Sequence, residues 1–147
     1  MAVVSDTSPL LNLAIIGRLD LVQQQFSAVL IPPIVLEELK VDTNLPGAET
    51  MRLALHTGWL QVAEVRDTYL AQALALELDL GEAAAIALAL DLGSLRILMD
   101  GHDGRAKAKA LGLLPIGVLG ILLRRLASRG FCTGTSRSGT GRTGSRK

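Results

Sequence analysis

The sequence predicts an α/β fold of three layers, in which a central parallel sheet lies between two layers of helices. Short apolar runs such as Ala2–Ser5 and Ala28–Ile31 alternate with longer segments of helical composition, a pattern typical of buried parallel strands joined by helices. Acidic residues, Asp6 and Asp100, directly follow two of the apolar runs. Ligands of such sheets bind beyond the carboxyl ends of the strands, so we expect Asp6 and Asp100 to share one crevice.

The strands are predicted from apolar runs of strand length. The run at 2–5 is β-branched, the run at 28–31 is stopped by two prolines, and the run at 95–99 leads into Asp100. Residues 59–65 alternate between apolar and polar, which is typical of a strand or an extended edge. In chain order, the expected strands are 2–5, 28–31, 59–65, 95–99 and 114–116.

The helices are predicted from their start and stop residues. Pro9 and the pair Pro32-Pro33 stand where a first helical turn favours proline. Gly93 and Gly112 follow alanine-rich segments, as glycine does at helix ends. Residues 79–81 and 101–104 are expected to be turns. In chain order, the expected helices are 6–17, 19–26, 32–39, 48–55, 69–78, 82–92, 105–111 and 117–128.

Composition limits the class of protein. The chain has 147 residues, of which 49% are apolar and 3% aromatic, which is typical of one helix-rich globular domain. No apolar run approaches the ~20 residues needed to span a bilayer, so we expect no membrane partner. One cysteine, Cys132, excludes an intramolecular disulfide, and the amino terminus lacks the pattern of a secretion signal. We therefore expect a cytoplasmic protein.

Charge is unevenly distributed along the chain. Residues 124–147 contain seven arginines or lysines and no acid, whereas the residues before them carry eight bases and fourteen acids. The last seventeen residues are rich in glycine, serine, threonine and arginine, which predicts a disordered tail at 131–147 after a domain at 1–130. Such a basic tail would contact nucleic acid or would simply be a solvated end.

Four acidic residues stand at the edges of apolar runs: Asp6, Glu38, Glu82 and Asp100. A fold that gathers four carboxylates would need a divalent cation to offset their repulsion. Each acid also has an ordinary interpretation. Asp6 would cap the helix that follows, Glu38 would be a surface residue, Glu82 would favour a helix dipole and Asp100 would begin a turn.

Four blocks of the sequence resemble a known family. They are Val3 to Ala14, Ile31 to Leu39, Leu78 to Ala89 and Ile97 to Arg105, and they resemble PIN-domain blocks, most closely those of small prokaryotic proteins related to VapC-type toxins. The resemblance runs in order and spacing over 3–123. It implies a ribonuclease dependent on Mg²⁺ or Mn²⁺, with Asp6, Glu38, Glu82 and Asp100 at the catalytic acidic positions and Thr7 and Ser8 at the hydroxyl positions.

The resemblance has two departures. Many relatives have a second acid directly after the acid that ends the strand, where this chain has Gly101, with Asp103 two residues further on. The tail after Gly130 also lacks the final strand or helix of the family. The expected metal ligands are therefore Asp6, Glu82, Asp100 and Asp103, because carboxylate oxygens suit Mg²⁺ or Mn²⁺.

The expected contacts with RNA are Thr7 and Ser8 beside the first acid, and Arg105, Lys107 and Lys109, which follow the last acid. The basic residues have an alternative interpretation as a solvated helical face.

We expect a metal-dependent endoribonuclease that binds RNA, with a cognate antitoxin protein as partner. A homodimer is also expected, through apolar helices such as 10–15 and 19–26. The first alternative is a catalytically impaired PIN-like module that binds RNA or protein. The second is a receiver-like phosphoacceptor domain, although the acid pair expected after its first strand is absent.

Overall fold

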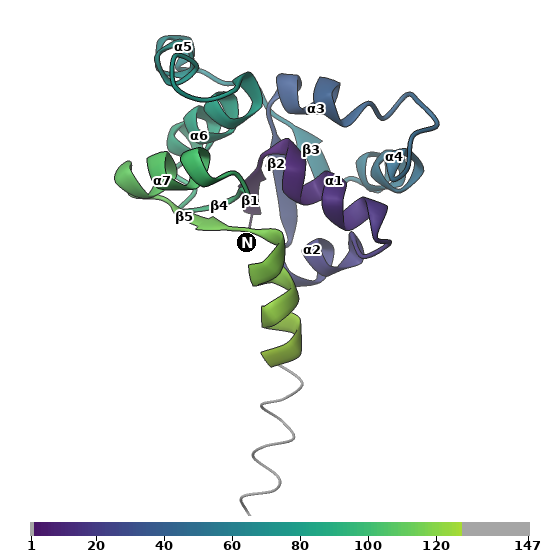
Figure 1. Cartoon of the computed structure of the whole chain (residues 1–147). Coiled ribbons are helices and arrows are strands. Elements are labelled where there is room, and N and C mark those ends of the chain that lie inside the picture. The colour runs from purple at the N-terminus through teal and green to yellow at the C-terminus, as the bar shows by residue number, and fades with distance from the viewer. Residues whose placement is uncertain (1, 128–147) are drawn as a thin grey trace, which may run out of the picture.

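The computed structural model describes residues 2–127, whose strands form one sheet of five parallel strands in the order β3-β2-β1-β4-β5 (Figure 1). In the central pairings, Val3 lies opposite Val29 and Val4 opposite Ile97. The predicted parallel sheet is therefore confirmed. The strands are β1 (Ala2–Ser5), β2 (Ala28–Ile31), β3 (Leu60–Val62), β4 (Arg96–Leu98) and β5 (Leu114–Ile116).

Helices cover both faces of the sheet and complete the predicted three layers (Figure 1). Val3 and Leu98 pack into one hydrophobic cluster, whereas Val4 and Ile97 pack into the other, because successive side chains of a strand point to opposite faces. The first cluster also receives Ile121 from the helical residues 118–127. The labelled helices are α1 (Thr7–Ile15), α2 (Asp20–Gln25), α3 (Pro33–Leu39) and α4 (Ala48–Thr57) on that side, and α5 (Thr68–Leu74), α6 (Leu80–Leu92) and α7 (His102–Ala110) on the other.

The chain changes sides of the sheet between β3 and β4. The connections from β1 to β2 and β3 run through α1 to α4, and those from β3 to β4 and β5 run through α5 to α7. The neighbouring strands β1 and β4 are therefore followed by helices on opposite faces, which opens a crevice at their carboxyl ends. The backbone N–H of Asp6 donates to the carbonyl of Leu98 at 2.9 Å, so the segment that follows β1 is still paired with the end of β4 where the crevice begins.

Two helices begin at least two residues earlier than predicted. Helix α6 begins at Leu80 rather than at Glu82, because the Asp79 side chain accepts the backbone N–H of Glu82 and the Glu82 side chain accepts that of Asp79. Helix α7 begins at His102, and the backbone N–H of Arg105 already donates to the carbonyl of Gly101 at 2.9 Å. The expected turn at 101–104 is therefore mostly helix.

The third strand is shorter than predicted, at Leu60–Val62. Ser128, the proposed boundary at 130 and the tail at 131–147 lie outside the described residues. Between residues 2 and 127, no helix has both the length and the apolar character that a membrane crossing requires.

Candidate active site

Asp6 follows β1 and is buried, with 4% of its surface exposed. Its backbone is extended, at φ −82° and ψ 176°, and its side chain forms no capping hydrogen bond with α1. The hydroxyl of the equally buried Ser5 donates to the Asp6 carbonyl at 2.8 Å. The interpretation of Asp6 as an ordinary helix cap is therefore wrong, and another partner is needed for its buried carboxylate.

Burial raises the pKa of Asp6 from 3.8 to about 7. The backbone N–H of Thr7 lowers the pKa, while the charges of Asp79, Glu82 and Glu38 raise it further. Glu38 lies on α3, and Asp79 and Glu82 lie together at the start of α6, so the fold brings charges from two distant segments to Asp6. A carboxylate in this setting takes up a proton or a cation near neutral pH.

Glu38, on α3, faces Asp6 across Gly81. The Thr7 hydroxyl donates to Glu38 Oε1 at 2.5 Å. A Cβ atom at Gly81 would overlap Glu38 Oε1 and would lie 3.1 Å from Asp6 Oδ1, so only glycine leaves room for both carboxylates. Thr7 thus holds an acid in place, and Ser8 is exposed in the same turn of α1.

Glu82 lies in the first turn of α6 and points toward the start of α7. A Cβ atom at Gly101 would overlap Glu82 Oε2, and one at Gly104 would lie 3.0 Å from the same oxygen. Partial burial raises the pKa of Glu82, and the charges of Asp79, Asp103 and Glu38 add to the rise. The position directly after Asp100 is thus next to the carboxylate of Glu82.

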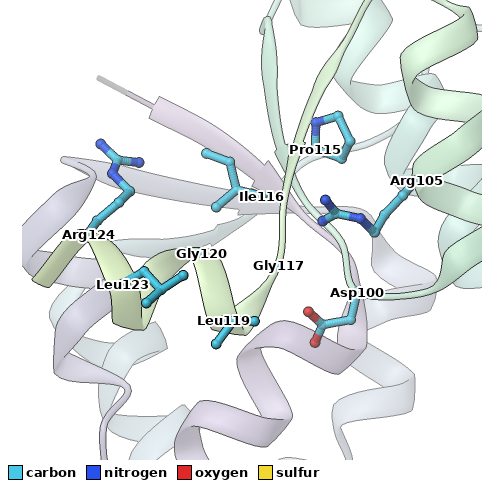
Figure 2. A pocket seen from close by; sticks show the side chains of 9 residues that line it. All are labelled: Asp100, Arg105, Pro115, Ile116, Gly117, Leu119, Gly120, Leu123 and Arg124. Carbon is cyan, nitrogen blue, oxygen red and sulfur yellow. The ribbon is translucent and has the colours of Figure 1, made fainter. Parts of the chain in front are cut away.

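Asp100 follows β4 and is half-buried. Its Oδ1 accepts the backbone N–H of Val118 at 2.7 Å, and its Oδ2 accepts the Asn12 amide at 3.4 Å. Arg105 lies beside it (Figure 2), and its Nη1 donates to the Met99 carbonyl at 3.0 Å. Asp100 therefore links the middle of α1 and the end of β4 to the start of the helical residues 118–127.

The remaining predicted residues lie further out. The Asp103 side chain is 84% exposed and lies 3.4 Å from His102, but its charge is close enough to raise the pKa of Glu82. Lys107 pairs with Glu77 at 3.0 Å and lines a surface groove with Asp103. Lys109 is exposed on α7. The fold thus places Arg105 beside Asp100, whereas Lys107 pairs with an acid outside the predicted set.

Comparison with known proteins places this arrangement in a family. The family model described as PIN domain matches residues 2–135. This chain belongs to the PIN-domain family. PIN domains are generally nucleases and usually use divalent metal ions.

One solved structure with this fold is that of PAE2754 from Pyrobaculum aerophilum. It is 23% identical, with a TM-score of 0.61, and the match covers 86% of this chain and 99% of that one. At this identity the likeness shows a shared fold. No curated protein matches the chain in sequence.

Sequence reasoning missed two side chains of this PIN domain. Asn12 donates to Asp100, and its only signal was its place on the expected first helix, four residues after Ser8. Asp79 caps α6 and raises the pKa values of Asp6 and Glu82. Its signal was the capping pattern of an acid followed three residues later by glutamate.

The acidic residues fit a hard divalent cation by their chemistry and by the space that glycines leave around them. None of the ion pairs among residues 2–127 involves Asp6, Glu38, Glu82 or Asp100. In the described part of the chain, no group of three or more acidic, histidine or cysteine side chains is arranged to hold a metal ion. Binding one at these acids would therefore need their side chains to move, and Glu38, Glu82 and Asp100 are not fully buried.

Proposed function

We propose that this PIN domain is an Mg²⁺- or Mn²⁺-dependent endoribonuclease that hydrolyses phosphodiester bonds of RNA. The observation that carries the proposal is the buried carboxylate of Asp6, which lies at the end of β1 among Glu38, Glu82 and Asp79 with its pKa raised to about 7. Asp6, Glu82 and Asp100 are the proposed cation ligands, with Asp103 as an outer one. Carboxylate oxygens are the donors that Mg²⁺ and Mn²⁺ prefer.

The bound cation would lower the pKa of a water molecule and neutralise charge on the scissile phosphate. Glu38 is exposed and already accepts a hydrogen bond from Thr7, so it is placed to accept a proton from an attacking water. Ser8 is proposed to contact the RNA backbone from α1. Arg105 is proposed to contact a phosphate because its guanidinium lies beside Asp100.

Cleavage of labelled RNA by the purified chain tests the proposal. With Mn²⁺ or Mg²⁺ present, Asp6→Asn and Asp100→Asn are each expected to lower the rate at least about a hundredfold, because each removes a ligand charge. Asp20→Asn is the matched control, since Asp20 pairs with Arg18 at an exposed site. RNA binding without cleavage at any metal concentration would refute the proposed activity.

A second candidate is a PIN domain that binds RNA or protein without cutting. It is favoured by the hydrogen bond between Asp100 and Val118 and by the absence of a three-ligand group within residues 2–127. In this case Asp6→Asn and Asp100→Asn would leave RNA affinity within about twofold of the original, and no variant would cleave. The same assay therefore separates the two candidates.

A homodimer is proposed as the working form. Leu10 and Leu13 of α1 and Leu21 of α2 are buried in the protein's own core, so they are not available to a partner. Ile15 and Ile16 at the end of α1 are 52% and 56% exposed and would supply the contact. Multi-angle light scattering is expected to give twice the chain mass, and Ile16→Asp is expected to give the monomer.

A cognate antitoxin protein is proposed to hold the nuclease inactive in the cytoplasm. Co-expression with the product of a small neighbouring reading frame is expected to relieve growth inhibition caused by this chain. Growth inhibition that persists, with no complex isolated, would count against the antitoxin.

A further inference from the structure

A surface groove of about 540 Å³ begins at Asp100 and runs along the start of the helical residues 118–127. Figure 2 shows Arg105 near Asp100 at one end, Arg124 at the other, and Ile116 between them. The volume is in the range of pockets that hold small organic ligands. Asp100 is in its lining, so the groove reaches one of the proposed cation ligands.

Two guanidinium groups make the groove a site for anions. Arg105 donates from Nη1 to the Met99 carbonyl at 3.0 Å, which fixes the side chain and leaves other N–H groups for a ligand. Arg124 lies over the ring of Phe26, with its guanidinium carbon 5.4 Å from the ring centroid. Asp100 is the sole acid in the lining, and neither arginine takes part in an ion pair within residues 2–127.

The wall between the arginines is apolar and exposed. Leu119 and Leu123 are one helical turn apart and are 69% and 52% exposed. Gly120 adds no side chain between these leucines and Ile116, since a Cβ atom there would lie 3.3 Å from Ile116 Cγ2. An apolar surface flanked by guanidinium groups matches a nucleotide, which has an apolar base face and a phosphate on either side.

We propose that this groove binds a nucleotide of single-stranded RNA beside the bond to be cut. Its base lies on Leu119 and Leu123, and its two phosphates lie at Arg105 and Arg124. A single strand fits better than a duplex, because its bases can turn out and lie on a protein surface. The assignment rests on the proposed ribonuclease function and extends it by giving the strand a path away from the acids.

Fluorescence anisotropy of a labelled single-stranded oligoribonucleotide in EDTA tests the groove without cleavage. With the full chain, Arg124→Ala is expected to weaken binding about five- to tenfold and to lower the salt slope by about 0.7, the value for one phosphate contact of a single strand. Arg125→Ala is the matched control, because Arg125 bonds to Gln24 and does not line the groove. Equal losses in both variants would overturn the assignment.

Two leucine variants test the apolar part of the groove independently of the arginines. Leu123→Ala is expected to weaken binding about threefold with the salt slope unchanged. Leu126 is also exposed but lies outside the groove, so Leu126→Ala is expected to have no effect. If Leu123→Asp instead splits an oligomer and leaves RNA affinity unchanged, the groove is a protein interface and the proposal is wrong. If the Arg124 and Leu123 variants bind normally while Asp6→Asn abolishes cleavage, the groove proposal fails and the nuclease function stands.

Discussion

Asp6 is a carboxylate whose position costs the folded protein stability when it is ionised. The pKa of Asp6 in the folded chain, about 7, lies above its ordinary value of 3.8. The folded state therefore holds a proton that the unfolded chain has released, and stability falls as the pH rises from about 4 to about 7. A shift of this size corresponds to a loss on the order of 4 kcal/mol above pH 7. Under the proposed function, a cation bound at Asp6 would offset this loss.

Asp6→Asn is expected to stabilise the metal-free protein at pH 8 by about 1–3 kcal/mol, because the amide keeps the shape and removes the buried charge. At pH 4 the gain should vanish, since Asp6 is then protonated. Thermal melts in EDTA at the two pH values measure this difference. Mn²⁺ should raise the melting temperature of the original chain and not of the variant. A variant less stable than the original at pH 8 would contradict this account of Asp6.

The absence of a side chain at Gly101 leaves room for the carboxylate of Glu82. Because the added methyl group would meet the far end of the flexible Glu82 side chain, Gly101→Ala is expected to cost less than about 1 kcal/mol of stability while displacing the carboxylate. Mn²⁺ affinity, measured by calorimetry, should fall about tenfold. In a Glu82→Gln background the same substitution should have little further effect, because the two residues act through one contact. Additive losses would contradict this coupling.

At the residue scale, the sequence predicted the acids better than their partners. Asp6 and Asp100 were predictable because each directly follows a strand, and parallel strands end at one edge. Asn12 was not, because its contact with Asp100 joins residues 88 positions apart. The sequence resemblance marked Gly101 as standing where an acid is expected, but its contact with Glu82 needed coordinates, since nothing in the sequence places Glu82 beside it.

At the scale of elements, the first turn of α6 positions Glu82, one of the proposed ligands. Asp79 and Glu82 exchange hydrogen bonds with each other's backbone N–H groups, so the cap of the helix also orients a proposed ligand. Helix α5 has a comparable cap in Asp67, which accepts the backbone N–H of Leu70 at 3.0 Å. The two caps therefore offer a comparison between a helix start inside the site and one outside it.

Asp79→Ala and Asp67→Ala are each expected to lower the free energy of unfolding by about 1 kcal/mol, and the corresponding serine variants by a few tenths. Only Asp79→Ala should weaken Mn²⁺ binding, by about tenfold, because fraying of α6 releases Glu82. Urea unfolding and calorimetry measure the two effects. Equal metal affinity in both alanine variants would show that the cap does not position the ligand.

Elements were predicted well where all sequence features favoured one structure, and poorly where glycines favoured a turn within a helical segment. The strands Ala2–Ser5 and Ala28–Ile31 were predicted with their observed bounds, because apolar runs bounded by Asp6 and by prolines leave no helical alternative. The starts of α6 and α7 were placed late, because glycines at 81 and 104 are typical of turns. Here both glycines are buried in first turns, where they make room for Glu38 and Glu82.

At the scale of the whole molecule, the strand order explains why residues so far apart in the sequence lie at one edge of the sheet. Placing β1 between β2 and β4 sets the end of the first strand beside that of the fourth, which is where a doubly wound sheet opens a crevice. The sequence predicted a parallel sheet but not this strand order, because the apolar residues of a buried strand do not indicate which strands it pairs with. The order follows from which helices cover which face.

The uneven distribution of charge along the chain predicts that the basic tail contributes to RNA binding. The five strands and both core clusters lie within residues 2–127, so deletion of 131–147 is expected to leave the melting temperature within about 2 °C, as for changes outside the core. The deletion removes Arg137, Arg142, Arg146 and Lys147 from a chain whose first 123 residues are acidic. RNA affinity at low salt should fall, and the salt slope should decrease by up to about 3. If the slope is unchanged, these four charges do not contact the phosphates, and the arginines of the groove would carry the electrostatic part of RNA binding.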